Sequence, residues 1–262
     1  MEELNAIYAA LAADGFSVET LRMIDNLTND ILYGRKDFTR FTLSEHAGLC
    51  KGGAPLIGAS LVAGYARRSL TAGGNVENSK GCNLASWEID EEQERMIEEW
   101  SKTKGLWFEN SENIIKKYFG PMIAQGAESK VYYKEGDTSV TKERASIYST
   151  TQKALDAIAL HNYLFPETAM RVIGFTRDSD GLMRMILTQP YIRCLRLAAK
   201  EEIDEMVAEK GFRDNKQGQG VNYISERLAL EDMHPANVFI DELTEKPICI
   251  DCIVKFIHSS IV

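Results

Sequence analysis

Apolar residues recur at helical spacing through the first 34 residues, and the pattern breaks at the dipeptide Asp14-Gly15. Apolar residues three and four positions apart form one face of a helix, and Asp-Gly is a turn signal. This segment therefore predicts two amphipathic helices. Residues 51–81 are instead rich in glycine and other small residues. They predict a loop with one short element.

A further helix is predicted from Asp90 to Lys102, where apolar residues again recur at helical spacing. Asp90 is a favourable N-cap residue, and Gln93, three positions later, is a suitable capping-box partner. Gly105 follows as a stop signal. We expect the Glu-rich face of this helix to lie at the solvated surface.

The pattern changes to strands and turns after Gly120-Pro121. Two β-prone runs joined by Glu135-Gly136-Asp137 predict a hairpin. A helix follows, and two more strands surround the turn D-S-D-G. The predicted order is strand, strand, strand, helix, strand, strand, over residues 123–128, 131–134, 139–142, 149–164, 170–177 and 182–192.

The last seventy residues predict a helix over 201–210 and resumed helical spacing over 223–230. A loop and two short strands then close the chain. Helices and strands are segregated along the sequence, which is typical of an α+β fold. We divide the chain into a mainly helical accessory region, a sheet-forming region and a closing region, at residues 1–118, 119–192 and 193–262.

Composition narrows the classes of function. The chain has 262 residues, 44% of them hydrophobic, and a formal net charge of -9. That length and composition can bury a substantial core without disulfides. The negative charge disfavours nucleic acid and membrane surfaces as partners. There is neither an N-terminal targeting pattern nor an apolar run long enough to span a bilayer, so a cytoplasmic location is expected.

Cys249 and Cys252 form a C-x-x-C pattern, which is typical of half a zinc site or of a redox pair. The sequence contains no second pair, and the flanking residues are apolar and β-prone. On a continuous strand the two sulfurs would point to opposite faces. We therefore interpret both as small buried hydrophobic residues. His46, His161 and His258 show no ligand spacing.

Four residues offer the side chains that phosphoryl transfer from ATP requires: a lysine for the α/β-phosphates, an Asp and an Asn for Mg²⁺, and an Asp near the acceptor hydroxyl. Asp232 and Asn237 have the five-residue separation of the protein-kinase catalytic loop. Asp251 follows at the place of the metal-binding Asp of D-F-G. Lys142 ends a predicted strand at the place of the phosphate-pairing lysine. These residues predict ATP and Mg²⁺ as cofactors, with Asn237 and Asp251 as metal ligands.

The stretch D-M-H-P-A-N, from Asp232 to Asn237, resembles the catalytic loop of aminoglycoside phosphotransferases and their relatives. More closely, residues from about 119 to 257 resemble the kinase domain found in polyvalent proteins of bacterial mobile elements. The resemblance implies a bilobal protein-kinase-like fold, with residues 119–192 as the N-lobe and 193–262 as a shortened C-lobe. It also implies transfer to a Ser, Thr or Tyr hydroxyl of a protein substrate.

The same resemblance implies a nucleotide site. The segment I-A-Q-G-A-E-S-K-V, which ends at Val131, has the spacing of a Gly-rich loop. It keeps the middle glycine, Gly126, whereas Ser129 occupies the position of the last one. For adenine, a hinge presents a backbone carbonyl and, two residues later, an N–H. Pro190 and Ile192 are compatible with these two roles.

Three features of the sequence depart from the protein-kinase pattern or need interpretation. The helical acid that pairs with Lys142 is usually a glutamate, and the candidate is Asp156, with a solvated helix-face Asp as the alternative. His234 is expected to brace the catalytic loop. The residues before the catalytic Asp are Leu230 and Glu231, so no arginine is placed to bind an activation-loop phosphate.

Eleven residues follow Asp251. We therefore expect region 1–118 to pack as a helical substitute for the missing C-lobe helices, or a partner to complete the site. Two alternative functions stay open. D-M-H-P-A-N favours a small-molecule phosphotransferase, and the reduced Gly loop favours a catalytically inert kinase-like binding module. No residue indicates the acceptor or the oligomeric state.

Overall fold

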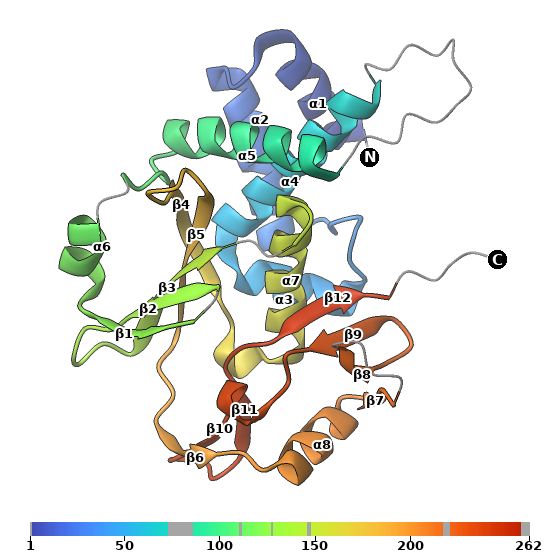
Figure 1. The fold of residues 1–262 in the computed structure, drawn as a ribbon. Coiled ribbons are helices and arrows are strands. Elements are labelled where there is room, and N and C mark those ends of the chain that lie inside the picture. The colour runs from blue at the N-terminus through green and yellow to red at the C-terminus, as the bar shows by residue number, and fades with distance from the viewer. Residues whose placement is uncertain are drawn as a thin grey trace.

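The computed structural model describes residues 2–72, 86–109, 112–126, 128–145, 148–216 and 221–257. Helices and strands are both abundant, which confirms the α+β prediction (Figure 1). Within these ranges, no helix combines the length and the apolar character of a membrane span.

Most of the described residues among the first hundred are helical. The two predicted N-terminal helices are confirmed, with a break at Gly15, whose φ of +56° suits a glycine. The prediction of a loop for residues 51–81 is wrong as far as residue 72, and residues 73–81 lie outside the described part. The helices are α1 (Glu2–Asp14), α2 (Val18–Leu32), α3 (Leu43–Lys51), α4 (Gly53–Ala72) and α5 (Ser86–Thr103).

The small residues of α4 are packing residues. A Cβ atom on Gly58 would lie 2.5 Å from the Trp100 ring of α5, and one on Gly64 would lie 2.8 Å from the hydroxyl of Tyr8. Much of α4 is buried. A helix that is buried around most of its circumference has no amphipathic pattern, so its sequence resembles a loop.

Helix α5 begins four residues earlier than predicted, so the N-cap prediction for Asp90 is wrong. The Asp90 carboxylate instead accepts hydrogen bonds from the N–H and hydroxyl of Thr151, at 2.5 and 2.7 Å. The side chain of Gln93 is buried and bonds to the carbonyl of Ala63 and the N–H of Gln152. Both residues therefore attach α5 to its neighbours. The helix ends before Gly105, as predicted.

Residues 112–190 form a helix, a five-stranded antiparallel sheet and a second helix that packs beside it. The predicted order of three strands, a helix and two strands is confirmed. Strand order is β1-β2-β3-β5-β4, and Val131 lies opposite Lys142. The elements are α6 (Glu112–Phe119), β1 (Met122–Gln125), β2 (Ser129–Tyr132), β3 (Ser139–Ala145), α7 (Thr151–Leu164), the 3-10 turn η1 (Pro166–Thr168), β4 (Arg171–Arg177) and β5 (Met183–Pro190).

The closing third contains one helix and two small sheets. The predicted helix over 201–210 is confirmed, whereas residues 223–230 form strands and not a helix. The apolar run 228–230 is buried between two strands, and so short a run has no diagnostic period. The elements are β6 (Cys194–Leu197), α8 (Lys200–Glu209), β7 (Arg213–Asp214), β8 (Val221–Ile224), β9 (Leu228–Glu231), η2 (Pro235–Asn237), β10 (Val238–Asp241), β11 (Pro247–Cys249) and β12 (Ile253–Phe256).

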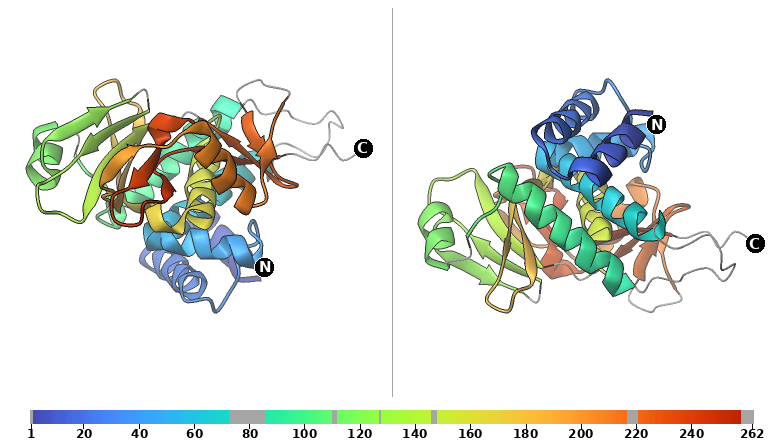
Figure 2. Two further views of the ribbon diagram at one scale, coloured as in Figure 1. Left: turned by 90° about the horizontal axis from the view of Figure 1, so that it is seen from below. Right: turned by 90° about the horizontal axis from the view of Figure 1, so that it is seen from above.

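One continuous hydrophobic cluster joins the N-terminal helices, α7 and the C-terminal strands. Helices α3 and α4 pack on α7, and α4 and α5 also reach β4. Figure 2 shows α1 to α4 on one side of the layer that contains the sheet, α7 and the C-terminal strands. These helices lie at the opposite end of the molecule from α8 and β10 (Figure 1). They therefore support α7 and do not lie beneath the predicted catalytic loop.

Candidate active site

A cavity of about 370 Å³ lies between the five-stranded sheet and the segments around η2 and β12. The residues predicted to act in phosphoryl transfer all reach it, although they come from distant parts of the chain. So do the residues predicted for the nucleotide, except Asp156. From the predicted set, the cavity is lined by Gly126, Ser129, Val131, Lys142, Pro190, Ile192, Asp232, Asn237 and Asp251.

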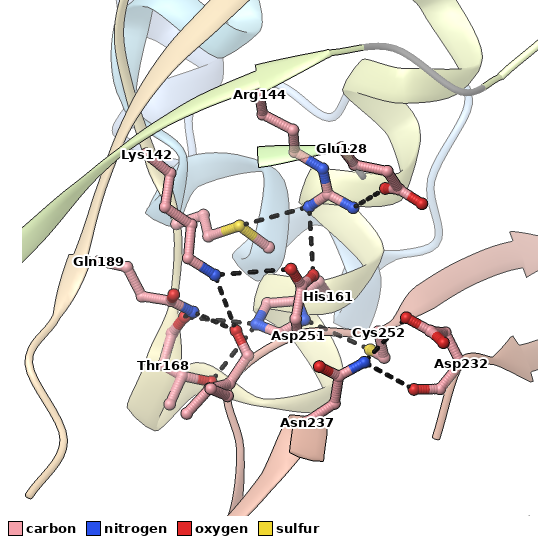
Figure 3. Close-up of polar contacts among 12 residues, drawn as sticks. Glu128, Lys142, Arg144, His161, Thr168, Gln189, Asp232, Asn237, Asp251 and Cys252 are labelled. Carbon is pink, nitrogen blue, oxygen red and sulfur yellow. Dashed lines mark hydrogen bonds and ion pairs between the residues drawn. The ribbon is translucent and has the colours of Figure 1, made fainter. Parts of the chain in front are cut away.

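The sheet presents two cations to the cavity. Val140, Lys142 and Arg144 alternate along β3 and line the cavity together, because side chains two apart on a strand share a face. Both cationic side chains are buried. The Nζ of Lys142 donates to the carbonyl of Ile250 at 3.1 Å and lies 3.6 Å from the Oδ2 of Asp251 (Figure 3).

The Asp251 carboxylate points toward these two cations (Figure 3). Its Oδ1 lies 3.5 Å from the Nη1 of Arg144. Burial alone would raise the pKa of Asp251, but the charges of Lys142 and Arg144 outweigh it and hold the pKa at about 2. Asp251 is therefore an anion throughout the physiological range.

Sequence reasoning missed Arg144 and Gln189. Arg144 also lies 3.5 Å from Glu128, which is in the connection between β1 and β2. Gln189 donates to the same Ile250 carbonyl that Lys142 contacts, at 3.0 Å. The signal that could have identified Arg144 is its position two residues after Lys142 on one strand.

The loop at Asp232 is fixed by its own side chains. Asp232 has a φ of +60°, a left-handed conformation that is rare outside glycine and recurs at functional sites. Its Oδ2 accepts a hydrogen bond from the Asn237 amide at 2.8 Å, and the same amide nitrogen donates to the Asp232 carbonyl at 2.9 Å. The carboxylate is half-exposed toward the cavity.

His234 connects this loop to η2. Its Nδ1 accepts from the N–H of Ala236 at 3.2 Å, so Nε2 carries the proton in the neutral ring. That Nε2 lies 3.1 Å from the Oδ1 of Asp232. Both carboxylate oxygens of Asp232 are therefore held by neighbours within the same six-residue stretch. These contacts agree with the bracing role expected for His234.

Two oxygens at the site fit a hard divalent cation. The Oδ1 of Asp251 is buried and accepts no hydrogen bond within the described residues. The amide nitrogen of Asn237 is turned to Asp232, which leaves its amide oxygen on the other side (Figure 3). Mg²⁺ prefers carboxylate and amide oxygens. Asn237 and Asp251 therefore have the donor chemistry that Mg²⁺ requires.

The predicted pairing of Asp156 with Lys142 is wrong. Asp156 forms an ion pair with Arg40 and accepts from the Gln152 amide at 3.0 Å. It lines a second cavity of about 670 Å³ on the side of the N-terminal helices. Burial raises its pKa to about 6, although the charge of Arg40 opposes the shift. The sequence could not indicate that Arg40 reaches α7, and Lys142 pairs with Asp251 instead.

The backbone at the end of β5 was predicted to bind adenine, which stays a prediction. The N–H of Tyr191 donates to the carbonyl of Thr138 at 2.9 Å. The N–H of Ile192 has no hydrogen-bond partner among the described residues. It therefore remains available to a ligand, as the hinge prediction requires. On the opposite wall, the N–H of Gly126 bonds to the Ser129 carbonyl at 2.8 Å.

The prediction that Cys249 and Cys252 are buried is confirmed, but the expected placement of their sulfurs is not. Cys249 ends β11 and Cys252 precedes β12, and residues 250–252 leave the strand conformation. The expectation of opposite faces assumed a continuous strand and is wrong. Both sulfurs lie within 4.8 Å of each other and of a ring nitrogen of His161.

Comparison with known proteins identifies a family for most of the chain. No curated protein matches the sequence. A family described as serine/threonine/tyrosine kinase found in polyvalent proteins matches residues 90–258. That range contains the whole cavity, the five-stranded sheet, α7 and the loop at Asp232. The chain therefore belongs to the family of serine/threonine/tyrosine kinases found in polyvalent proteins.

Proposed function

We propose that the protein is an ATP- and Mg²⁺-dependent kinase that transfers the γ-phosphoryl group to a Ser, Thr or Tyr hydroxyl of a protein. The observation that carries the proposal is the single cavity that joins Lys142, Asp232, Asn237 and Asp251. Phosphoryl transfer depends on positioning and electrostatic stabilisation, for which these four side chains suffice. The arrangement is bilobal and kinase-like, with the sheet and α7 as one lobe and the segment from residue 193 as a shortened second lobe.

Each residue then has a defined task. When bound, Mg²⁺-ATP supplies the phosphoryl group and neutralises charge as the transfer proceeds. Lys142 and Arg144 bind phosphate oxygens, and Asn237 and Asp251 hold the metal. Asp232 orients the acceptor hydroxyl and accepts its proton. Its carboxylate is already fixed by Asn237 and His234, so little reorganisation is needed.

The adenine end of the site uses backbone groups. The free N–H of Ile192 donates to the base, and the carbonyl of Pro190 accepts from it. Gly126 leaves open space above the phosphates, because a Cβ atom there would have its nearest neighbour at 3.9 Å. The fold itself therefore does not require this glycine. Its use is to admit the ligand.

Binding and transfer are tested separately. In a thermal-shift titration, Mg²⁺-ATP at 100 times its Kd should stabilise the fold by about 2.7 kcal/mol. Asp232→Asn should keep this shift and lose transfer to a protein panel from labelled ATP. Asp251→Asn should lose most of the shift. Parent-like turnover in both variants would refute the assigned roles.

Two specific observations favour other candidate functions. His234 braces Asp232 within D-M-H-P-A-N, the stretch that resembles aminoglycoside phosphotransferases. Labelled ATP with aminoglycosides and amino alcohols as acceptors therefore belongs in the same assay. Among the described residues, no acid on α7 pairs with Lys142, which favours an inert module. An inert module, with only a residual nucleotide site, would show neither the thermal shift nor transfer to any acceptor.

A further inference from the structure

A second group of metal-type ligands lies behind the candidate active site. A ring nitrogen of His161 and the Sγ atoms of Cys249 and Cys252 all lie within 4.8 Å of one another, and Nδ1 is 3.4 Å from the Sγ of Cys252. His161 comes from α7, and the cysteines lie on either side of the break between β11 and β12. All three side chains are buried, with at most 2% of their surface exposed. None of them lines the cavity described above.

The hydrogen bonds of His161 direct a lone pair at the sulfurs. Its Nε2 lies 3.3 Å from both the carbonyl and the hydroxyl of Thr168. That hydroxyl donates to the carbonyl of Cys249 at 2.6 Å, so it can only accept from the ring. Nε2 therefore carries the proton, and the unprotonated Nδ1 faces Cys252 at 3.4 Å (Figure 3). A backbone carbonyl that fixes the tautomer is the usual outer partner of a metal-binding histidine.

The distances suit a cation of the thiophilic type. Bonds of about 2.3 Å to sulfur and 2.0 Å to nitrogen, at tetrahedral angles, place neighbouring ligand atoms about 3.5–3.8 Å apart. The Nδ1 of His161 and the Sγ of Cys252 are 3.4 Å apart, close to this range, and Cys249 lies within 4.8 Å of both residues' ligand atoms. The Sδ of Met233, a soft thioether donor, lies 3.9 Å from the Sγ of Cys249.

Charge also favours a metal here. Two thiolates, a neutral imidazole and one Zn²⁺ form an uncharged complex, which can be buried without an uncompensated charge. When Zn²⁺ enters, the two thiols release two protons, whereas Cu(I) gives an uncharged site with the release of one proton. Without metal, the thiols have weak partners: Cys249 donates to the carbonyl of Asp251 at 3.2 Å, and Cys252 faces His161.

We propose that His161, Cys249 and Cys252 bind one thiophilic closed-shell cation, Zn²⁺ or Cu(I), at a structural site separate from that for Mg²⁺. Such an ion fastens α7 to the segment that carries Asp251, because Asp251 lies between the two cysteine ligands in the sequence. The site is independent of the phosphoryl-transfer proposal. Its donors are soft, whereas those of Asn237 and Asp251 are hard oxygens.

The test uses the intact chain, kept reduced with a phosphine and stripped by a chelator. Zn²⁺ is titrated against a chromophoric competitor in excess Mg²⁺ without ATP, and Cu(I) is titrated in a parallel arm against a copper-selective competitor. We expect one equivalent bound per chain and no competition by Mg²⁺. The arm with the tighter binding identifies the ion. Substitution with Co²⁺ should give the strong thiolate-to-metal charge-transfer absorption of a two-sulfur site.

Variants of the ligand residues test where the ion binds. A measurement on the unmodified chain keeps the test valid if a variant fails to fold. Cys252→Ser and His161→Gln should each weaken Zn²⁺ binding at least tenfold, whereas Cys194→Ser, at an exposed cysteine, should bind like the parent. In the unmodified chain, Zn²⁺ at 100 times its Kd should raise Tm by about 5 °C or more.

Three results would overturn the proposal: less than a tenth of an equivalent bound in both arms, a Co²⁺ spectrum without thiolate absorption, or displacement of Zn²⁺ by Mg²⁺. The first two would mean that the cluster is only a thiol-imidazole hydrogen bond. The third would place the ion at the carboxylate site.

Discussion

Gly48 on α3 packs directly against the backbone of α7, so Gly48→Ala tests how α7 is held. The added Cβ atom would lie 2.5 Å from the backbone nitrogen of Tyr163 and closer still to the carbonyl oxygen of Ala159. Carbon contacts are normally about 3.5 Å or longer, so the two helices would have to separate by about 1 Å. Because both contacts are with backbone, no side-chain rotation can relieve them.

The expected magnitude follows from two opposing effects. Alanine in a helix is favoured over glycine by about 1 kcal/mol. Overpacking typically costs about 1–3 kcal/mol, and a clash with backbone belongs at the upper end. Gly48→Ala should therefore lower the free energy of unfolding by about 2 kcal/mol. For a chain of this size, that lowers Tm by about 4–8 °C.

Gly64→Ala in α4 is the matched control. Its Cβ atom would meet only the end of the Tyr8 side chain, whose hydroxyl can move away. The free energy of unfolding of this variant should lie between about 0.5 kcal/mol below and about 1 kcal/mol above that of the parent. Urea unfolding and calorimetry measure both variants. Equal stability of Gly48→Ala and Gly64→Ala would refute the packing argument.

Three further outcomes are expected. Burial raises the pKa of Asp156 to about 6, so between pH 4 and 6 the carboxyl group is protonated in the folded state but not in the unfolded state. Relative to Asp156→Asn, the parent should therefore lose about 2 kcal/mol of unfolding free energy between pH 4.5 and pH 7.5, measured by urea unfolding. Parallel pH profiles of the two proteins would contradict this. Asp90→Ala removes two hydrogen bonds to the start of α7 and should cost about 1–2 kcal/mol in the same assay, whereas Glu91→Ala, at an exposed neighbour, should cost less than about 0.5 kcal/mol. Gly126→Ala should leave Tm within about 1 °C, because the added Cβ atom meets no close neighbour in the protein. It should weaken ATP binding several-fold in calorimetric titration, because we assign the open space at Gly126 to the ligand. Unchanged affinity would contradict that assignment.

The parts of the site that the sequence predicted are those set by local spacing. Asp232 and Asn237 are five residues apart, and their contact is made within one loop and one 3-10 turn. Lys142 was predicted from its place at the end of a predicted strand, and the structure places it opposite Val131. Asp251 was predicted from its place after Asn237 in the kinase pattern. Whether these residues carry out catalysis stays a prediction.

The parts that sequence reasoning missed depend on distant segments. Arg40 reaches Asp156 from 116 positions away, and His161 meets Cys252 from 91 positions away. No period or motif spans such separations. Helix α4 was missed for another reason, because its burial on most sides leaves no amphipathic pattern. The break after Cys249 was also missed, since most of the residues around it are apolar and β-prone.

The continuous hydrophobic cluster has a practical consequence for work on this family. The family match begins at residue 90, within α5, yet α7 buries its apolar residues against α3 and α4. Excising residues 90–258 would uncover that face, and exposed apolar patches of this kind promote aggregation. Loss of solubility or activity in such a fragment would result from removal of the N-terminal helices and would not show that the intact protein is inactive. Screens for acceptors or inhibitors should therefore keep the N-terminal helices attached.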